Sequence, residues 1–136
     1  MKRFASRLLS LILVASLFLT GCSVLSSRTL LSGNYQQDTL YVIDNLSQAI
    51  TLPNDDPNKA DSQATAGSLI SEYVSRYRRK PQLASSGSFM MMATALNGLA
   101  GHYNSYPNRP LPQKLKDRLD QEFEQAKISL KREFAT

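Results

Sequence analysis

The chain has 136 residues, a formal net charge of +5 and a single cysteine, Cys22. This length suits one domain with one hydrophobic core. Because a lone cysteine has no partner within the chain, an intramolecular disulfide is excluded and the core alone must hold the fold.

The N-terminus has the pattern of a lipoprotein signal. Three basic residues precede a run from Leu8 to Leu19 that is apolar except for two serines. The run is shorter than the roughly 20 residues of a spanning helix, so residues 1–21 are predicted to be a removable signal peptide. The stretch Leu19-Thr-Gly-Cys22 resembles the bacterial lipobox, which predicts lipidation at Cys22. A fortuitous cysteine after an ordinary signal peptide is the alternative.

Loss of the signal peptide changes the charge balance. The remaining 115 residues carry 13 basic and 11 acidic side chains, a net charge of about +2. This composition gives no support to nucleic-acid binding. Residues 22–34 are serine-rich and are predicted to form a lipidated, flexible tether, with the folded domain at 35–136.

Four segments show the apolar spacing of amphipathic helices and are separated by stretches rich in Pro, Gly, Asn and Ser. They span about 35–52, 60–79, 89–106 and 112–134. No segment alternates with period two, so the sequence predicts an all-α fold, an up-down-up-down four-helix bundle. The expected core positions are Leu40, Ile43, Leu46 and Ile50; Ala66, Ile70, Tyr73, Val74 and Tyr77; Phe89, Met92, Ala93, Leu96, Leu99, Ala100 and Tyr103; Leu115, Leu119, Phe123, Ala126, Leu130 and Phe134.

The sequence offers little for catalysis or metal binding. His102 is the only histidine, and no free thiol remains after lipidation of Cys22. Neither a nucleophile elbow nor a glycine-rich phosphate loop is present. Asp55, Asp56 and Asp61 lack the EF-hand spacing and are expected near a helix start, where carboxylates are favourable. We therefore expect no enzymatic activity, no cofactor and no metal.

Arg76, Arg78, Arg79 and Lys80 form a dense basic cluster at the end of the second predicted helix. Cations in a last helical turn interact favourably with the helix dipole, so a structural role is available. Four cations in five residues exceed what capping needs. An acidic protein surface or anionic lipid headgroups would explain the surplus.

The third predicted helix contains two unusual features. Three consecutive methionines, Met90 to Met92, cannot all face one core, so at least one lies in a helix seam or on an interaction surface. Gly98 and Gly101 each cost about 1 kcal/mol relative to alanine inside a helix. We expect either a neighbouring helix or a docked partner to approach their backbone closely.

The connection after this helix has the composition of a binding loop. Residues 101–112 contain two tyrosines, an arginine and three prolines. Tyrosine and arginine are common in interface hot spots, and proline lowers the entropic cost of presenting them. From this chemistry and the surplus charge of the basic cluster, we expect partner contacts at Arg76, Arg78, Arg79, Tyr103, Tyr106, Asn108 and Arg109.

Several motifs resemble those of the small lumenal photosystem II assembly and repair lipoproteins of cyanobacteria, a family that also has plant relatives. These motifs are GNYQQDTL at 33–40, SRYRR at 75–79, TALNGLAGHY at 94–103, SYPNRPLP at 105–112 and Lys114-Leu-Lys116. Together with the lipobox they cover nearly the whole chain in family order. The methionine triplet is the one departure, since a polar residue is expected among the methionines.

The resemblance implies a four-helix bundle held by lipid to the lumenal face of the thylakoid membrane. It implies binding to photosystem II intermediates through the large lumenal loop of an inner antenna chlorophyll protein. The bound protein would keep the extrinsic oxygen-evolving subunits away until the manganese cluster is built. A monomer without catalytic activity is expected. The alternative is a permanent lipidated structural subunit of the mature oxygen-evolving complex.

Overall fold

The structure, a computed structural model, describes residues 29–135. The predicted signal peptide, Cys22 and the tether up to residue 28 lie outside the described residues. The described chain forms the long helices α2 (Tyr35–Thr51), α3 (Lys59–Arg78), α5 (Gly87–Ser105) and α6 (Gln113–Glu133), and the short helix α4 (Pro81–Ala84). The all-α prediction is confirmed, and residues 29–135 contain no strand.

The long helices begin and end within two residues of the predicted positions, because clear sequence signals set their ends. The side chain of Asn34 accepts a hydrogen bond from the Gln37 N–H (3.0 Å) at the start of α2. Ser86 caps α5 in the same way through the Phe89 N–H (3.2 Å). Helix α4 was not predicted, although Pro81 is well suited to a first helical turn.

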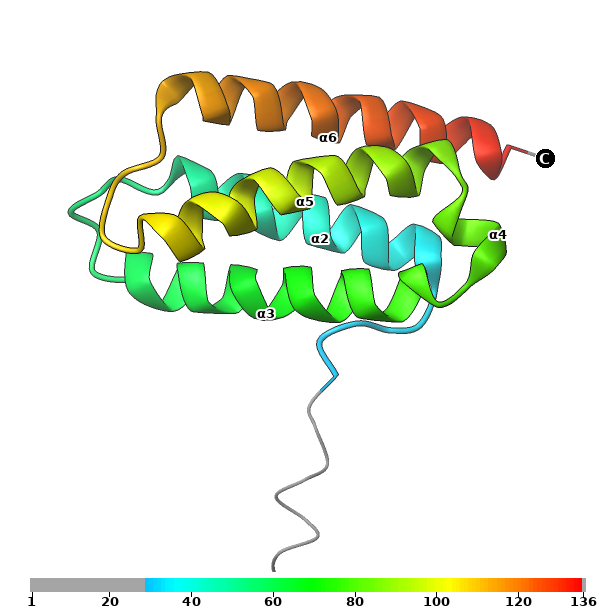
Figure 1. The fold of residues 1–136 in the computed structure, drawn as a ribbon, viewed down its shortest axis with the longest axis horizontal. Helices are drawn as coiled ribbons and strands as arrows, with labels where there is room; N and C mark the ends of the chain where they lie inside the picture. Colours follow the sequence, from blue (N-terminus) through cyan, green and yellow to red (C-terminus); the bar gives the residue numbers. More distant parts are fainter. Residues whose placement is uncertain (1–28, 136) are drawn as a thin grey trace, which may run out of the picture.

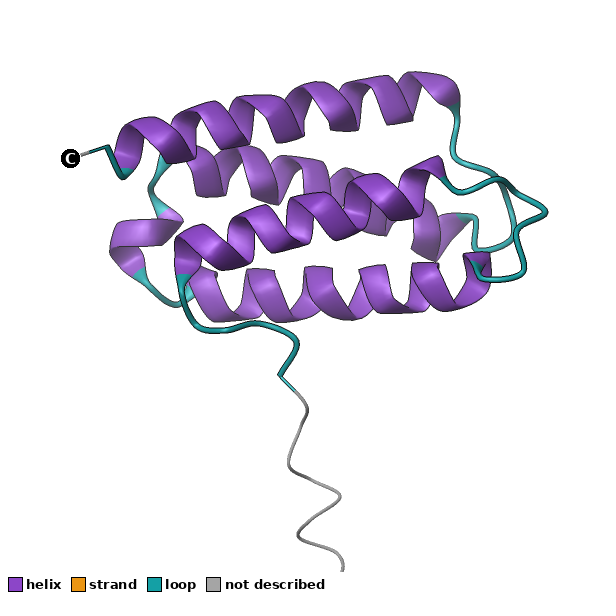
Figure 2. Ribbon diagram, turned by 180° about the vertical axis from the view of Figure 1, so that it is seen from behind, coloured by secondary structure: helices purple, strands orange, loops and turns teal. Residues whose placement is uncertain are grey.

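The four long helices lie side by side, and consecutive long helices run in opposite directions (Figure 1; seen from behind in Figure 2). Helix α5 packs most extensively against α6, and α2 against α3. We call the end where α3 and α6 finish and α2 and α5 begin the α4 end. The opposite end, with the α2–α3 and α5–α6 connections, is the loop end.

Most of the predicted core positions are buried, but two are not. Leu40 and Phe134 are 39% and 42% exposed. Five more predicted positions, Val74, Ala93, Ala100, Tyr103 and Leu115, are only partly buried against the core. The prediction also missed seven buried positions, five in helices and two in the segments before α2 and α6: Tyr35, Val42, Ala49, Leu69 and Ala95; Leu31 and Leu111.

Aromatic rings fill the core at the α4 end. The Tyr35 ring lies 4.9 Å from that of Tyr77 and 6.0 Å from that of Phe134, between centroids. Tyr73 packs against Tyr77 and Phe89 in the same cluster. The cluster joins α2, α3 and α5 to the residue after α6, so all four long helices meet here.

A buried carboxylate lies beside these rings. Asp38 is 2% exposed and accepts hydrogen bonds from the Ser32 hydroxyl (2.6 Å), the Ser32 N–H (2.8 Å), the Gly33 N–H (3.0 Å) and the Tyr77 hydroxyl (2.5 Å). Burial alone would raise the pKa of Asp38, but the hydrogen bonds from Ser32, Tyr77 and Gly33 together outweigh it and lower the pKa.

The described end of the predicted tether is therefore held against the bundle. Glu72 of α3 accepts hydrogen bonds from the Leu30 N–H (2.9 Å) and the Leu31 N–H (3.3 Å). Leu31 itself is only 5% exposed. The packed part of the chain thus begins about four residues before the predicted domain start at residue 35.

Replacing Asp38 with asparagine should lower the free energy of unfolding by about 2–4 kcal/mol, because an amide places its own N–H groups among four donors. The lowered pKa of Asp38 also stabilises the fold above the ordinary aspartate pKa of about 3.9, and this stabilisation is lost as pH falls through the folded-state pKa. Urea unfolding at pH 7 and pH 3 should show that the free energy of unfolding falls less between the two pH values for Asp38→Asn than for the parent. An equal acid loss would contradict this role.

Candidate functional site

The structure separates the predicted partner-binding residues into two groups. Arg76, Arg78 and Arg79 lie at the α4 end, whereas Tyr103, Tyr106, Asn108 and Arg109 lie at the loop end (Figure 1). Helix α3 has 20 residues, so the two ends are about 30 Å apart. One compact patch cannot contain all seven residues.

The basic cluster at the α4 end is only partly engaged within the bundle. Arg76 pairs with Glu72 on the same helix (3.1 Å), and the Lys80 ammonium lies 5.3 Å from the Tyr77 ring centroid. Arg78 and Arg79 are exposed and make no ion pair with any described residue. These two guanidinium groups are therefore free to meet an external anion.

The loop end carries a braced arrangement around Arg109. The Arg109 guanidinium lies 5.3 Å from the Tyr106 ring centroid, and the backbone N–H of Arg109 donates a hydrogen bond to the backbone carbonyl of Tyr106 (3.1 Å). The Arg109 carbonyl lies 3.3 Å from Nε2 of His102. Tyr106 is 48% exposed, so this loop presents an aromatic ring and a cation in a fixed relation.

A hollow of about 290 Å³ separates this loop from the α2–α3 connection. Lys59 and Asp56 line one wall, and Asn108 and Arg109 line the other. The Lys59 ammonium is tied to the Asn54 side-chain oxygen (2.5 Å) and the Leu52 carbonyl (3.3 Å). Asn108 and Arg109 therefore lie across the hollow from polar residues of the α2–α3 connection, and the two loops together form one polar surface.

Tyr103 differs from the rest of its predicted group because it packs against the core. Its hydroxyl oxygen is buried and has no hydrogen-bond partner among the described residues. Burial raises the pKa of Tyr103 to about 12. A partner approaching the loop end would therefore meet Tyr106 rather than the Tyr103 hydroxyl.

Helix α5 presents an uncharged outer face. It contains no Asp, Glu, Lys or Arg, and a Cβ atom added at Gly98 or Gly101 would meet nothing within 4 Å. The alternative of a neighbouring helix close to these glycines is therefore wrong within the described residues, and a docked partner there stays a prediction. The methionines divide as expected: Met92 is fully buried and Met90 is 60% exposed.

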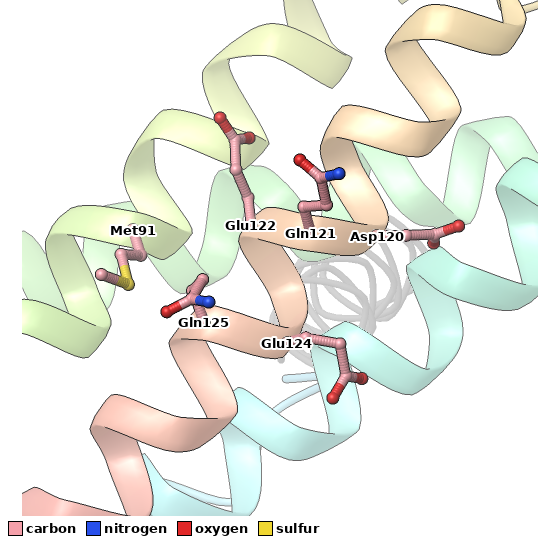
Figure 3. Close-up of a pocket in the computed structure, with 6 residues that line it drawn as sticks. All are labelled: Met91, Asp120, Gln121, Glu122, Glu124 and Gln125. Carbon is pink, nitrogen blue, oxygen red and sulfur yellow. The ribbon is translucent and has the colours of Figure 1, made fainter.

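A hollow of about 560 Å³ is lined by Met91 of α5 and by five residues of α6, and Figure 3 shows these side chains. Its carboxylates, Asp120, Glu122 and Glu124, point in different directions rather than toward one centre. Within residues 29–135, no three His, Cys, Asp or Glu side chains are grouped to hold a metal ion. The described helices also include none long and apolar enough to cross a membrane.

The described part of the chain is thus a small helical bundle whose prominent features are surfaces. The chain matches the family model described as Photosystem II Pbs27 over residues 5–130. It therefore belongs to the photosystem II Psb27 family.

Three named relatives support this membership. The photosystem II assembly factor lipoprotein Psb27 of Thermosynechococcus vestitus is 52% identical over 98% of both chains. The photosystem II lipoprotein Psb27 of Synechocystis sp. PCC 6803 is 53% identical over 97% of this chain and 96% of its own. The photosystem II repair protein PSB27-H1 of Arabidopsis thaliana is 35% identical over 72% of this chain and 57% of its own.

The fold agrees with a solved relative. The solution structure of Psb27 from cyanobacterial photosystem II superposes with a TM-score of 0.74 and 53% sequence identity, covering 80% of this chain and 95% of that one. The resemblance found from the motifs is therefore confirmed over nearly the whole chain. The individual interface residues stay predictions.

Replacing Gly98 with alanine should raise the free energy of unfolding by about 1 kcal/mol, because the added methyl group meets no atom and the helix gains propensity. Gly33→Ala is the matched control: Gly33 has φ +95°, so alanine there should destabilise by about 1–2 kcal/mol. Urea denaturation of both variants measures the difference. A loss of stability in Gly98→Ala would show that the bundle itself needs this glycine.

Replacing Tyr103 with phenylalanine should leave the free energy of unfolding unchanged or raise it by up to about 1 kcal/mol, because it removes a buried hydroxyl that has no partner. Tyr77→Phe is the control, since the Tyr77 hydroxyl donates to Asp38 and its loss should be destabilising. Thermal unfolding of the two variants gives the comparison. Equal destabilisation would mean that the Tyr103 hydroxyl does have a partner.

Proposed function

We propose that this chain is a lipid-anchored assembly and repair factor of photosystem II. The observation that carries the proposal is the 52% identity, over 98% of both chains, to the photosystem II assembly factor lipoprotein of Thermosynechococcus vestitus. The name of the plant relative supports a repair role. The lipobox supports Cys22 as the anchor, which would hold the protein at the lumenal face of the thylakoid membrane.

The mechanism that fits this scaffold is occupation of a binding site. The up-down-up-down four-helix bundle would bind intermediates through the lumenal loop of an inner antenna chlorophyll protein. Bound there as a monomer, it would exclude the extrinsic oxygen-evolving subunits until the manganese cluster is assembled. The lipid anchor raises the effective concentration near membrane-embedded partners, so a modest interface suffices and release stays easy.

The loop end supports a role in protein recognition. Tyr106 and Arg109 are exposed, stacked on each other and held by backbone contacts. Such pre-organised aromatic and cationic side chains lose little entropy on binding. Asn108 beside them adds amide hydrogen-bonding groups. The uncharged outer face of α5 runs from this end and would widen the contact.

Affinity purification of the tagged, lipidated protein from solubilised membranes tests the proposal, with partner identification and a manganese assay on the eluate. Photosystem II cores that lack manganese and the extrinsic subunits are the expected result. Stoichiometric recovery with active complexes would instead identify a permanent structural subunit. Recovery without any photosystem component would overturn both.

The variant Tyr106→Ala/Arg109→Ala should weaken binding to the purified intermediate by at least about tenfold, because each residue has hot-spot chemistry. The matched control is Tyr41→Ala/Lys127→Ala, which removes an exposed tyrosine and a cation from the sides of α2 and α6. Surface-immobilised binding measures both, and circular dichroism verifies the folds. Equal affinity of the two double variants would remove the loop end from the interface.

A further inference from the structure

We propose that the α4 end of the bundle lies on an anionic lipid surface, so that the loop end points away from the bilayer. The contact surface consists of the exposed cations at this end: Arg78, Arg79, Lys80, Lys131 and Arg132. The inference goes beyond the proposed function and takes from it only the anchor at Cys22.

The fold concentrates these cations because α3 and α6 finish at the same end (Figure 1). Arg78 ends α3, Arg79 and Lys80 follow it directly, and Lys131 and Arg132 lie in the last turn of α6. None of the five forms an ion pair within residues 29–135. The helix dipole accounts for a cation in the last turn, but Arg79 and Lys80 lie beyond the last residue of α3. Their charge is therefore surplus to the requirements of the fold.

The described side-chain carboxylates at this end offset only part of the positive charge, because they are three in number and each is held by donors of the fold. Asp38 is buried among four donors. Glu72 binds Arg76 and the N–H groups of Leu30 and Leu31. Glu133 accepts the N–H (2.9 Å) and hydroxyl (2.5 Å) of Ser88. Six cations, Arg76 and the five of the contact surface, stand against these three carboxylates, so the described side chains at the α4 end carry a net charge of about +3.

The loop end is closer to neutral. Asp55, Asp56 and Asp61 lie in or beside the α2–α3 connection there, and Asp117 lies in the first turns of α6. They offset all but about one of the five cations of that end, which are Lys59, Arg109, Lys114, Lys116 and Arg118. An anionic bilayer would therefore attract the α4 end and gain little from the loop end.

The tether joins the bundle nearer to the α4 end than to the loop end. The first described residues of the chain bind Glu72 of α3. Along the helix axis, Glu72 lies about 9 Å from the last residue of α3, Arg78, and about 20 Å from its first residue, Lys59. Thr29 lies seven positions after Cys22, a distance along the chain of at most about 25 Å. A lipidated Cys22 can therefore sit in a bilayer that touches the α4 end.

An acidic protein surface would offer similar chemistry, but the anchor favours the bilayer. Once Cys22 is inserted, lipid headgroups are present at high local concentration beside the α4 end at all times. Each cation near an anionic membrane surface strengthens binding by about fivefold. The orientation that results would present Tyr106 and Arg109 about 30 Å above the bilayer.

Energy transfer from a single fluorophore to headgroup acceptors tests this orientation. Because lipidation consumes the only native thiol, Gln82→Cys at the α4 end or Asn104→Cys near the loop end gives one labelling site in the mature lipidated protein. In vesicles of phosphatidylglycerol and phosphatidylcholine, transfer should be clearly stronger from position 82. The difference should disappear in pure phosphatidylcholine and in Arg78→Gln/Arg79→Gln/Lys80→Gln. Stronger transfer from position 104, or an unchanged difference in the triple variant, would overturn the proposal.

Co-sedimentation of the mature chain carrying Cys22→Ser separates the surface from the anchor. The triple glutamine variant should bind phosphatidylglycerol vesicles at least about tenfold more weakly. The matched control Lys114→Gln/Lys116→Gln/Arg118→Gln, which removes three cations from the start of α6, should change binding less than about twofold.

Three further outcomes are distinguishable. Equal losses in the two triple variants would overturn the proposal, because they would show an effect of net charge alone. If the triple glutamine variant of Arg78, Arg79 and Lys80 binds vesicles as the parent does but loses binding to photosystem II intermediates, the basic cluster contacts the protein partner. That result would also overturn the proposal. An unmodified Cys22 by mass spectrometry would remove the anchor, while co-sedimentation would still decide the surface.

Discussion

The ionised carboxylate of Asp38 is the interaction on which the α4 end depends. It gathers the backbone before α2 and a tyrosine of α3 around one buried charge. A buried carboxylate is costly unless donors surround it, and the four donors here meet that requirement. Because two of them belong to Ser32 and one to Gly33, the network fixes the path of the chain as it leaves the bundle. The direction from which the bundle is tethered is thus set by folding.

The sequence predicted the helices well because their signals are local. Apolar spacing, Asn34 and Ser86 as caps, and prolines at the breaks all act within a few residues. It misplaced Leu40 and Phe134, which are partly exposed and line a surface hollow between α2 and the end of α6. It also missed the docking of residues 30–33, because the acceptors Asp38 and Glu72 are read locally as ordinary helix carboxylates. Only the packing of α2 against α3 brings them to that segment.

The candidate surface residues were predictable by chemistry but not by position. Surplus cations and a tyrosine-rich, proline-stiffened loop are visible in the sequence, whereas their location at opposite ends follows from the antiparallel order of α3 and α5 (Figure 1). Tyr103 shows the same limit: it shares the composition of the loop, yet its place on the inner side of α5 buries the hydroxyl. For the glycines of α5, the sequence shows that they lower helix stability, but no neighbouring atom within the described bundle explains why glycine is needed there.

The separation of the two surfaces has a consequence for how such a protein could be released. If a single patch provided both membrane and protein contacts, loss of the partner would also weaken the hold on the bilayer. In this structure the cations lie at the α4 end, and Tyr106 and Arg109 lie at the loop end. The free energy of membrane binding and the free energy of partner binding are then independent, because sites about 30 Å apart are well beyond the screening length of roughly 8 Å at physiological ionic strength. Under the proposed function, the bundle would leave one intermediate while staying oriented for the next. Weak binding at the loop end would then be an advantage, because rebinding would occur at the high effective concentration that a lipid anchor at Cys22 would provide.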